Sequence, residues 1–455
     1  MKSPPGGAMA LLRGLLPAFA GAVAGLVLHL AVAPRIGPFW SKVLMTIGIN
    51  VILAVSLTIV NGFTGQFSIG HAGFMAVGGY SAGAMSYYAS LAAWGTNAVE
   101  GGRLSGGALE GRSGALLTEG DWLFAGSLLV GGLVAALLGF LVGLPSLRLR
   151  GDYLAIVTLG FGEIVRVLLQ QTGPVLEPPP PPVTPEAARA VSKLVSGTPP
   201  WILVGKLGGA LGFTGLPKYT SVFWVSVLAI ATFLVAYRLK RSSYGRAFLS
   251  IREDEIAAEA VGVNTTRYKV WAFVISAFFA GMAGGLFAHT TGVQLNPVEL
   301  GFQKSFDVII MVVLGGLGSI SGAAIAAATL TVLLEALRAL EVSFFTLTAY
   351  AGVIVLGLSA LFAVGRALRG WRGESWRRPA LRSAGLGAGL FAVAWIGRLA
   401  LPGVFGYSVM LGDYRMILYA LALVLMMIAR PQGLFGVREI WERAAWEWLG
   451  VGRKA

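Results

Sequence analysis

Long apolar runs, separated by short polar or charged segments, repeat along this sequence. A helix needs roughly 20 mostly apolar residues to cross a bilayer. The candidate spans are residues 9–32, 39–60, 70–93, 122–144, 153–169, 220–237, 268–288, 306–334, 344–364, 384–396 with a tail to 401, and 414–428. The pattern predicts an all-α, polytopic membrane protein with about 10–12 transmembrane helices, some of them broken or re-entrant.

Two of these runs carry matching glycine-rich interruptions. The first is NGFTGQFSIGHAG, which begins at Asn61, and the second is GGLGSISG, which begins at Gly315 and divides the run 306–334. Paired, glycine-interrupted segments in two halves of a transporter point to its central site. A broken helix frees backbone amides and carbonyls at membrane depth, and the N-terminus of a half-helix can hold a carboxylate.

We therefore interpret the two interruptions as candidate parts of a substrate path. Each places two glycines and a serine at intervals of three residues. The candidate path residues are Gly62, Gly65, Gln66, Ser68, His71, Gly315, Gly318 and Ser321. The alternative is that the glycines only let helices approach closely, as Gly79 with Gly83 or Gly281 with Gly285 would do in a small-xxx-small pattern.

Composition supports the membrane class and excludes several kinds of site. Only 12% of the residues are charged, where about 25% is usual for soluble proteins, and the mean hydropathy is +0.75. The chain has no cysteine and only three, widely separated histidines, so no metal site is predicted. No nucleophile–base pair or carboxylate cluster is evident, so we predict no catalytic residue, no cofactor and no enzymatic activity.

The net charge of +14 lies mostly in short loops, which indicates membrane topology rather than nucleic-acid binding. The basic segments 148–150, 238–269, 366–382 and 430–454 are predicted to be cytoplasmic, and the acidic loop 95–121 external. Alternation then requires the run 306–334 to begin and end outside, as two short crossings or as a hairpin that dips in. Both termini are predicted to lie inside, in a plasma (inner) membrane.

Some polar side chains fall within predicted spans. Glu163 and Arg166 stand three residues apart on one helix and are predicted to form a structural pair. Lys304 and Asp307 have the same spacing and either pair or line a path. His289 lies near the end of a span, where a satisfied interfacial role is the simpler interpretation.

The pattern divides the chain into segments. Residues 1–38 hold an N-terminal transmembrane segment, and residues 39–334 form a core with a proline-rich external loop at 174–219 and a cytoplasmic loop at 238–267. The proline run favours an extended spacer without a domain of its own. Residues 335–409 form an insertion with extra transmembrane helices, 410–436 a final core helix, and 437–455 a cytoplasmic tail.

Five stretches together resemble the permeases of branched-chain amino acid ABC importers, and most closely the M-type subunit of the LivHM family. They are NGFTGQFSIGHAGFMAVGGYSAG, RGDYLAIVTLGFGEIVR, the stretch from SSYGRAFLSIREDE to FFAGMAGGLF, VVLGGLGSISG, and DYRMILYALALVLMMIARPQGLFG. The resemblance implies a type II-like importer. Its other parts are a second permease subunit in a heterodimer, two ATP-binding subunits and an external amino-acid-binding protein, with membrane lipid around them and no nucleic acid.

The sequence has no GxxxxGK[ST] loop, so energy is expected to come from the partner ATPases. The loop of the family that contacts the ATPase corresponds to residues 244–267. The candidate coupling residues are Arg252, Glu253, Asp254, Glu255, Ala257, Ala258, Glu259 and Gly262. The charged members are expected to face the partner, and the small ones to allow close approach.

Two departures from the family keep alternatives open. The segment TGP at residues 172–174 replaces the usual TGG, and residues 335–409 intervene before the last core helix. The expected function is import of branched-chain or related amino acids. The alternatives are a permease for urea, short amides or another small polar solute, a stand-alone secondary transporter, and a membrane enzyme; the last two lack supporting carboxylates.

Overall fold

The structure is a computed structural model that describes residues 17, 19–97, 99, 101–106, 115–146, 152–178, 184–290, 294–339, 341–343 and 408–410, and single positions at 421, 424, 433, 435–436 and 439–441. The chain divides into two compact units. The first comprises Met1–Val332 with Leu425–Ala455, and the second Leu333–Val424. The spans predicted at 344–364, 384–401 and 414–428 fall almost entirely outside the described residues.

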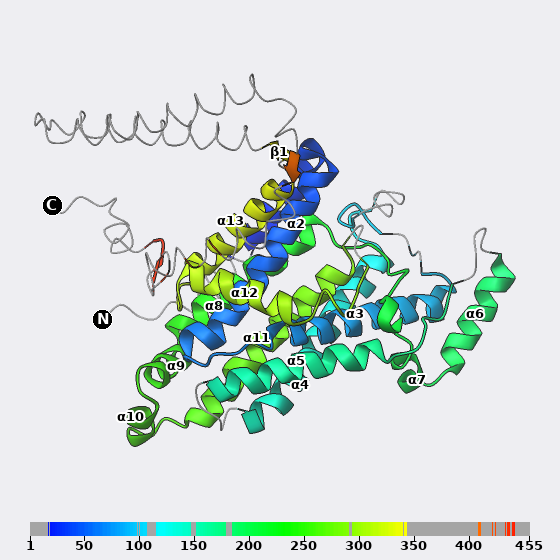
Figure 1. Cartoon of the computed structure of the whole chain (residues 1–455). Coiled ribbons are helices and arrows are strands. Elements are labelled where there is room, and N and C mark those ends of the chain that lie inside the picture. Colours follow the sequence, from blue (N-terminus) through cyan, green and yellow to red (C-terminus); the bar gives the residue numbers. More distant parts are fainter. Residues whose placement is uncertain are drawn as a thin grey trace, which may run out of the picture. The chain divides into compact units, whose positions relative to one another are not determined.

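Helix α11 (Thr265–Ala288) forms the centre of the first unit, where it packs against α3 (His71–Trp94) and α4 (Glu119–Ser146) (Figure 1). Glycines allow this approach. A Cβ added at Gly78 would overlap the Cα and carbonyl group of Gly281, and one at Gly79 would lie 2.9 Å from the carbonyl oxygen of Gly284. Gly131 of α4 faces Gly78 at the same crossing. These glycines are therefore packing residues, as the small-xxx-small alternative supposes.

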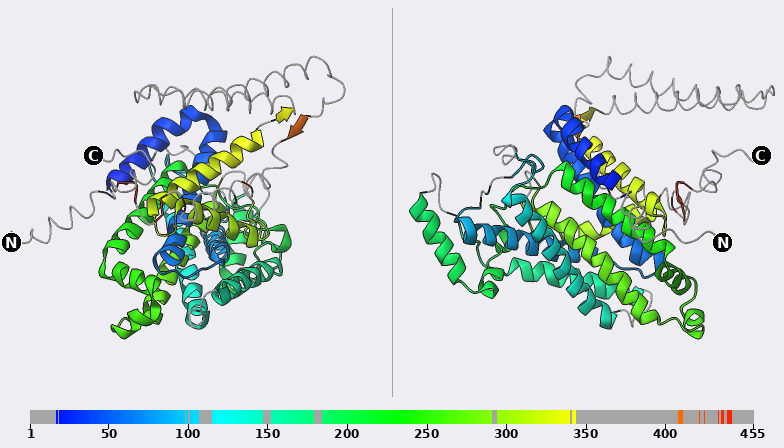
Figure 2. Two further views of the ribbon diagram at one scale, coloured as in Figure 1. Left: turned by 60° about the vertical axis from the view of Figure 1, so that its left-hand side comes forward. Right: turned by 180° about the vertical axis from the view of Figure 1, so that it is seen from behind.

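A long helical segment at the N-terminal end covers a second group of helices. The elements η1 (Leu28–Val32), α2 (Ala33–Leu57) and η2 (Thr58–Phe63) run on from one another, with a kink where Gly37 has φ +80° just before Pro38. Helix α2 packs against α8 (Val222–Arg241) and α12 (Phe302–Gly315) (Figure 2). Helix α13 (Ile320–Ala339) joins this group through a hydrogen bond of 2.9 Å between Asn50 and Thr331.

The prediction of an all-α membrane protein is confirmed. Five described helical segments are long and apolar enough to cross a bilayer: Phe19–Phe63, Glu119–Pro145, Tyr153–Gln170, Val222–Arg241 and Thr265–Ala288. Helix α5 (Asp152–Gln170) supplies the third of these. Helices α3, α12 and α13 lie beside them with shorter or more glycine-rich sequences. Bundled helices satisfy their own backbone groups, as the interior of a bilayer requires.

Small helices occupy both ends of the bundle. Helices α9 (Ser243–Glu253) and α10 (Glu255–Ala260) lie at one end, and α6 (Pro185–Gly197) and α7 (Pro200–Val204) at the other (Figure 1). A short 3₁₀ turn, η4 (Gly209–Leu211), precedes the bridge between Phe213 and Leu295.

Residues 185–197, within the segment that is predicted to be a loop without a domain of its own, form the helix α6. Thr184 caps this helix by accepting a hydrogen bond from the amide of Ala187, and Pro185 stands at its first position, where a missing N–H costs nothing. The buried Val195 and the hydrogen bond of 2.6 Å from Ser192 to the carbonyl of Ala92 hold α6 against the end of α3. The proline run itself lies partly outside the described residues.

In the second unit, the described residues include two short strands, β1 (Glu341–Ser343) and β2 (Ser408–Met410), which pair antiparallel. Ser343 stands opposite Ser408. The two ends of the intervening segment therefore lie side by side.

Candidate substrate path and coupling loop

Both glycine-rich stretches interrupt helices, and the two interruptions touch. The first break lies between η2, which ends at Phe63, and α3, which begins at His71; the second lies between α12 and α13. A Cβ added at Gly62 would stand 2.7 Å from the amide nitrogen of Gly318. Gly65, with φ +69°, and Gly318, with φ +100°, both adopt backbone conformations that favour glycine. Residues more than two hundred positions apart in the sequence thus form one candidate site.

Polar groups inside the first break are mostly used to hold it together. The side chain of Asn61 accepts a hydrogen bond of 3.2 Å from the amide of Ser68 and donates one of 3.5 Å to its carbonyl. His71 Nε2 lies 2.9 Å from Ser56 Oγ, which links the start of α3 to α2. By contrast, the side-chain oxygen of Gln66 is buried without a hydrogen-bond partner among the described residues. In this group, the side-chain oxygen of Gln66 is therefore the atom available to accept a hydrogen bond from a solute.

A carboxylate occupies the second break, but it belongs to the chain itself. The amides of Ile320 and Ser321, at the start of α13, donate hydrogen bonds of 3.1 and 3.0 Å to Glu439. The hydroxyl of Ser321 donates a further one of 2.7 Å. Sequence reasoning predicted an anion-binding half-helix here but missed Glu439, because nothing in a basic tail marks one glutamate as buried. Gly315 packs closely against Gly322 across the turn.

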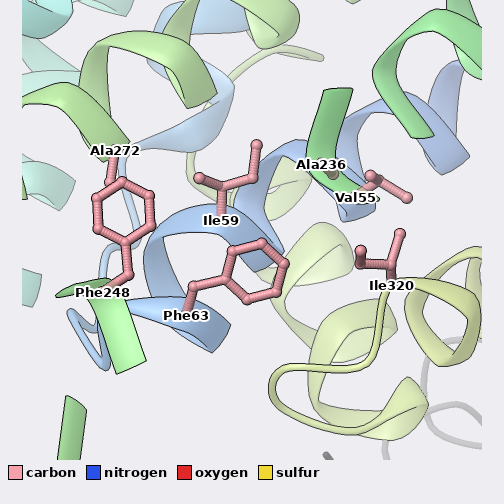
Figure 3. Close-up of a cluster of buried hydrophobic side chains, with 7 residues drawn as sticks. All are labelled: Val55, Ile59, Phe63, Ala236, Phe248, Ala272 and Ile320. Carbon is pink, nitrogen blue, oxygen red and sulfur yellow. The ribbon is translucent and has the colours of Figure 1, made fainter. Parts of the chain in front are cut away.

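The loop 238–267 folds into the hairpin of α9 and α10, and one side of α9 faces the breaks. Phe248 is fully buried in a cluster with Val55, Ile59, Phe63, Ala236, Ala272 and Ile320 (Figure 3). These side chains come from both broken segments as well as from α8, α9 and α11. Arg252, near the end of α9, donates a hydrogen bond of 3.0 Å to the carbonyl of Gly62. A Cβ added at Gly65 would meet the side chain of Arg252 at 2.9 Å. The predicted coupling and path residues therefore meet at Arg252.

Three of the predicted coupling carboxylates make contacts inside the chain. Asp254 caps α10 by accepting hydrogen bonds of 2.9 and 3.0 Å from two amides. Glu255 forms an ion pair of 2.6 Å with the buried Lys269, and Glu259 accepts a hydrogen bond of 2.6 Å from Thr265. These three carboxylates therefore stabilise the hairpin itself, a role that the spacing of residues in the sequence does not predict.

The exposed surface of the hairpin combines charged side chains, among them Glu253, Asp254 and Glu259, with a small apolar patch. Ile256 is 68% exposed and Val261 is 78% exposed, and Ala257 lies open beside them. Glu253 is also exposed and pairs with Arg252 at 3.3 Å. Ala258 is buried, whereas Gly262, with φ +89°, has nothing near the position of its missing side chain. The apolar patch of Ile256, Ala257 and Val261 is therefore a candidate docking site.

Glu163 and Arg166 form the ion pair that their spacing predicts, with 2.6 Å between Arg166 Nε and Glu163 Oε2. The other oxygen of Glu163 accepts a hydrogen bond of 3.1 Å from the amide of Phe302, at the start of α12. Lys304 donates a hydrogen bond of 2.9 Å to the side chain of Asn50. His289 lies 2.6 Å from Ser86 Oγ. The first of these contacts lies within α5, and the other three link different helices or their ends. No group of side chains suited to a metal ion is found in the part of the chain that the structure describes.

The break between α12 and α13 allows a test of topology. Charge alternation predicts that both ends of the run 306–334 lie outside the cell. Because the chain has no cysteine, single cysteines at Gln303 and Glu341 report on each end separately. We expect an impermeant thiol reagent added to intact cells to label both. Labelling of only one position would mean that α12 and α13 together cross the membrane once.

Comparison with known proteins shows which family the sequence resembles. A family model described as "Branched-chain amino acid transport system / permease component" matches residues 39–358. The chain is 34% identical over 324 residues to the high-affinity branched-chain amino acid transport system permease protein LivM of Salmonella typhimurium. It is 34% identical over 320 residues to LivM of Escherichia coli. Both alignments cover 68% of this chain and 65% of the relative, just under two thirds of its length.

A second kind of relative matches over a shorter region. The permease protein LivH of the same transport system in Escherichia coli is 37% identical over 105 residues, which are 23% of this chain and 33% of LivH. No solved structure shows significant similarity to the chain. Since the family model covers well over half of the sequence, the protein belongs to the family of permease components of branched-chain amino acid transport systems.

Proposed function

We propose that this chain is the transmembrane permease subunit of an ATP-binding cassette importer that carries branched-chain or related amino acids into the cell. The names of the LivM relatives support the substrate class. The observation that carries the mechanism is the position of α9. Phe248 and Arg252 of this helix contact both broken segments, so a force applied to the hairpin reaches the candidate path directly.

The breaks are suited to weak, transient contacts with a zwitterionic solute. Gln66 offers a buried side-chain oxygen in the first break, and a broken helix brings backbone donors and acceptors to membrane depth. An amino acid has one carboxylate and one ammonium group, which such donors and acceptors can bind in turn. A path must also release its substrate, so specificity rests mainly with an external binding protein.

The proposed partners follow from family and topology. A second permease subunit, two ATP-binding subunits and an external amino-acid-binding protein complete the importer. Similarity to both LivM and LivH supports a pair of related permeases. The basic loops and tail support an inner-membrane protein with both termini in the cytoplasm.

The test is reconstitution of the complete importer. A tagged chain is isolated from native membranes with its partners, identified by mass spectrometry, and inserted into proteoliposomes with ATP inside. We expect ATP-dependent uptake of radiolabelled leucine, isoleucine or valine in the presence of the binding protein. Urea and acetamide are measured in parallel. Uptake of urea or acetamide without uptake of amino acids would show that the proposed substrate is wrong. Uptake of any solute without an ATPase would refute the proposal of an ATP-driven importer.

The exposed face of α10 provides a prediction about the ATPase contact. Replacing Ile256 with Asp introduces a charge at a site that we expect to be buried against the ATPase. Loss of an apolar contact at the centre of an interface costs about 2 kcal/mol, or roughly 30-fold in affinity. ATPase copurification and uptake should fall together. Leu211→Asp is the matched control, because Leu211 is 81% exposed and lies in η4, outside the hairpin. Normal copurification with Ile256→Asp would remove α10 from the interface.

A further inference from the structure

The described residues of the C-terminal tail lie against the break between α12 and α13. The amide of Phe435 donates a hydrogen bond of 3.2 Å to the carbonyl of Gly315. A Cβ added at Gly316 would lie 2.5 Å from the carbonyl oxygen of Gly436, and one at Gly433 would lie 2.6 Å from the Cα of Gly316. The turn and the tail therefore approach as backbone against backbone, a contact that only glycines permit.

Glu439 makes the most extensive polar contacts of this region. Its carboxylate is 3% exposed and accepts hydrogen bonds from the amides of Ile320 and Ser321 and from the hydroxyls of Ser319 and Ser321. Burial by itself raises the pKa of Glu439, but hydrogen bonds from Lys240 and Ser321 hold the pKa below its usual value. The carboxylate is thus charged at neutral pH and sits at the positive end of α13.

Lys240 connects this carboxylate to the base of the coupling loop. Its ammonium group lies 2.6 Å from Glu439 and donates a hydrogen bond of 2.8 Å to the carbonyl of Gly318. Lys240 belongs to the last turn of α8, directly before α9. The same ammonium therefore touches the tail, the break and the helix that leads into the hairpin.

An aromatic contact secures the tail beyond Glu439. The ring of Trp441 meets Tyr237 edge-on, with 5.6 Å between the ring centroids, and meets Phe233 at 6.1 Å. Both partners belong to α8. The tail is consequently fixed to α8 at two points, through Glu439 to Lys240 and through Trp441 to Tyr237 and Phe233.

We propose that the described tail residues Gly433, Phe435, Gly436 and 439–441 form a latch, in which Glu439 positions the start of α13 against Lys240 in the resting importer and must release it during transport. This proposal rests on the proposed function. Force from the ATPases is proposed to enter through α9 and α10, next to Lys240. Lys240 and the tail both bind the turn between α12 and α13. The break can widen only if the contact between Glu439 and Lys240 parts. Glu439 is a positioning residue, since it acts through α13 and not on the solute.

A reversible cross-link tests the latch. Cysteines replace Tyr237 and Trp441 in the otherwise cysteine-free chain, within the complete importer, and a short bis-methanethiosulfonate reagent joins them. We expect cross-linking to lower uptake by at least about tenfold. A covalent link holds the tail on α8 at least as firmly as one charged hydrogen bond, which corresponds to about tenfold or more in an equilibrium constant. Reduction should restore uptake. Each single-cysteine variant, treated in the same way, is the control. Full uptake by the cross-linked importer would overturn the latch, as would failure of the pair to cross-link.

The rate of cross-linking is a readout that does not depend on the substrate. ATP with orthovanadate should slow the reaction, because the tail leaves α8 during turnover. If the importer carries no amino acid but this dependence is present, the proposed substrate fails and the latch stands. If uptake is normal and nucleotide has no effect, the latch fails alone. The pair Phe233→Cys with Trp441→Cys repeats the test should Tyr237→Cys disturb folding.

The role of Glu439 itself is tested in the same assay. Glu439→Gln keeps the shape of the side chain but removes its charge, and should slow cross-linking in the resting importer about tenfold. Glu439→Asp retains the charge and should restore part of the rate. The double variant Glu439→Gln with Lys240→Met should cross-link only slightly more slowly than Glu439→Gln alone, because the two residues act as one unit. Unchanged cross-linking in Glu439→Gln would show that the carboxylate does not position the tail.

Discussion

Replacing Gly78 with Leu is expected to leave almost no folded protein. The new side chain would begin inside the backbone of Gly281, where α3 crosses α11, and Gly131 of α4 closes the third side. Backbone atoms cannot move aside as a flexible side chain can, so the three central helices would have to separate. We expect a destabilisation above about 4 kcal/mol, which is exceptional for one substitution. Yield after detergent extraction and the thermal unfolding midpoint measure the effect.

Gly126→Leu is the matched control. Gly126 also lies in α4, but its missing side chain has only the end of Met85 nearby, at 4.0 Å. This variant should fold normally. A stable, monodisperse Gly78→Leu protein would mean that α3 and α11 do not cross at these glycines, and the arrangement of the central helices would need revision.

Gly62→Val should fail in a different way, by stopping transport while the protein remains folded. A Cβ here meets the amide of Gly318 at 2.7 Å and the side chain of Thr58 at 2.8 Å. The turn after Gly315 is not part of a helix, so we expect it to shift against the tail and Lys240, at a cost of about 1–3 kcal/mol for an overpacked site. A cost of that size in one state of the transport cycle changes its population by about 5- to 150-fold. Uptake should fall within this range.

Basal ATPase activity and complex formation should persist in Gly62→Val. The control is Gly160→Val, because Gly160 in α5 has nothing within 4 Å of its missing side chain. If Gly62→Val lost assembly in the same way as Gly78→Leu, the breaks would be packing contacts and their assignment to the path would fail. Gly318 gives a less direct test, since its φ of +100° strains any side chain regardless of space.

The positions of the helix breaks could be predicted from the sequence, because glycine clusters inside apolar runs are a local signal. The pairing of Glu163 with Arg166 is local too, since three residues are almost one helical turn. That the two breaks touch could not be predicted. The contact between Gly62 and Gly318 depends on how α2 and α12 pack, which no spacing within either segment specifies.

The charged residues of the coupling loop show a second limit. Sequence alone marks Asp254, Glu255 and Glu259 as charges available to a partner, yet the structure uses each one to shape the hairpin. Asp254 binds the backbone amides that directly follow it, and Glu255 pairs with the buried Lys269, which is fourteen residues away in the sequence. The exposed Ile256 was overlooked, because an isolated apolar residue in a charged loop carries no periodic signal.

The pairing of β1 with β2 has a consequence for the ends of the stretch between them. Ser343 and Ser408 stand across from each other, so the intervening residues leave and return at one point. Antiparallel strands are joined by backbone hydrogen bonds, which hold paired residues at a fixed separation. The segment that follows α13 and the segment that precedes the last predicted core helix are therefore tied together through β1 and β2, whatever the number of residues between them.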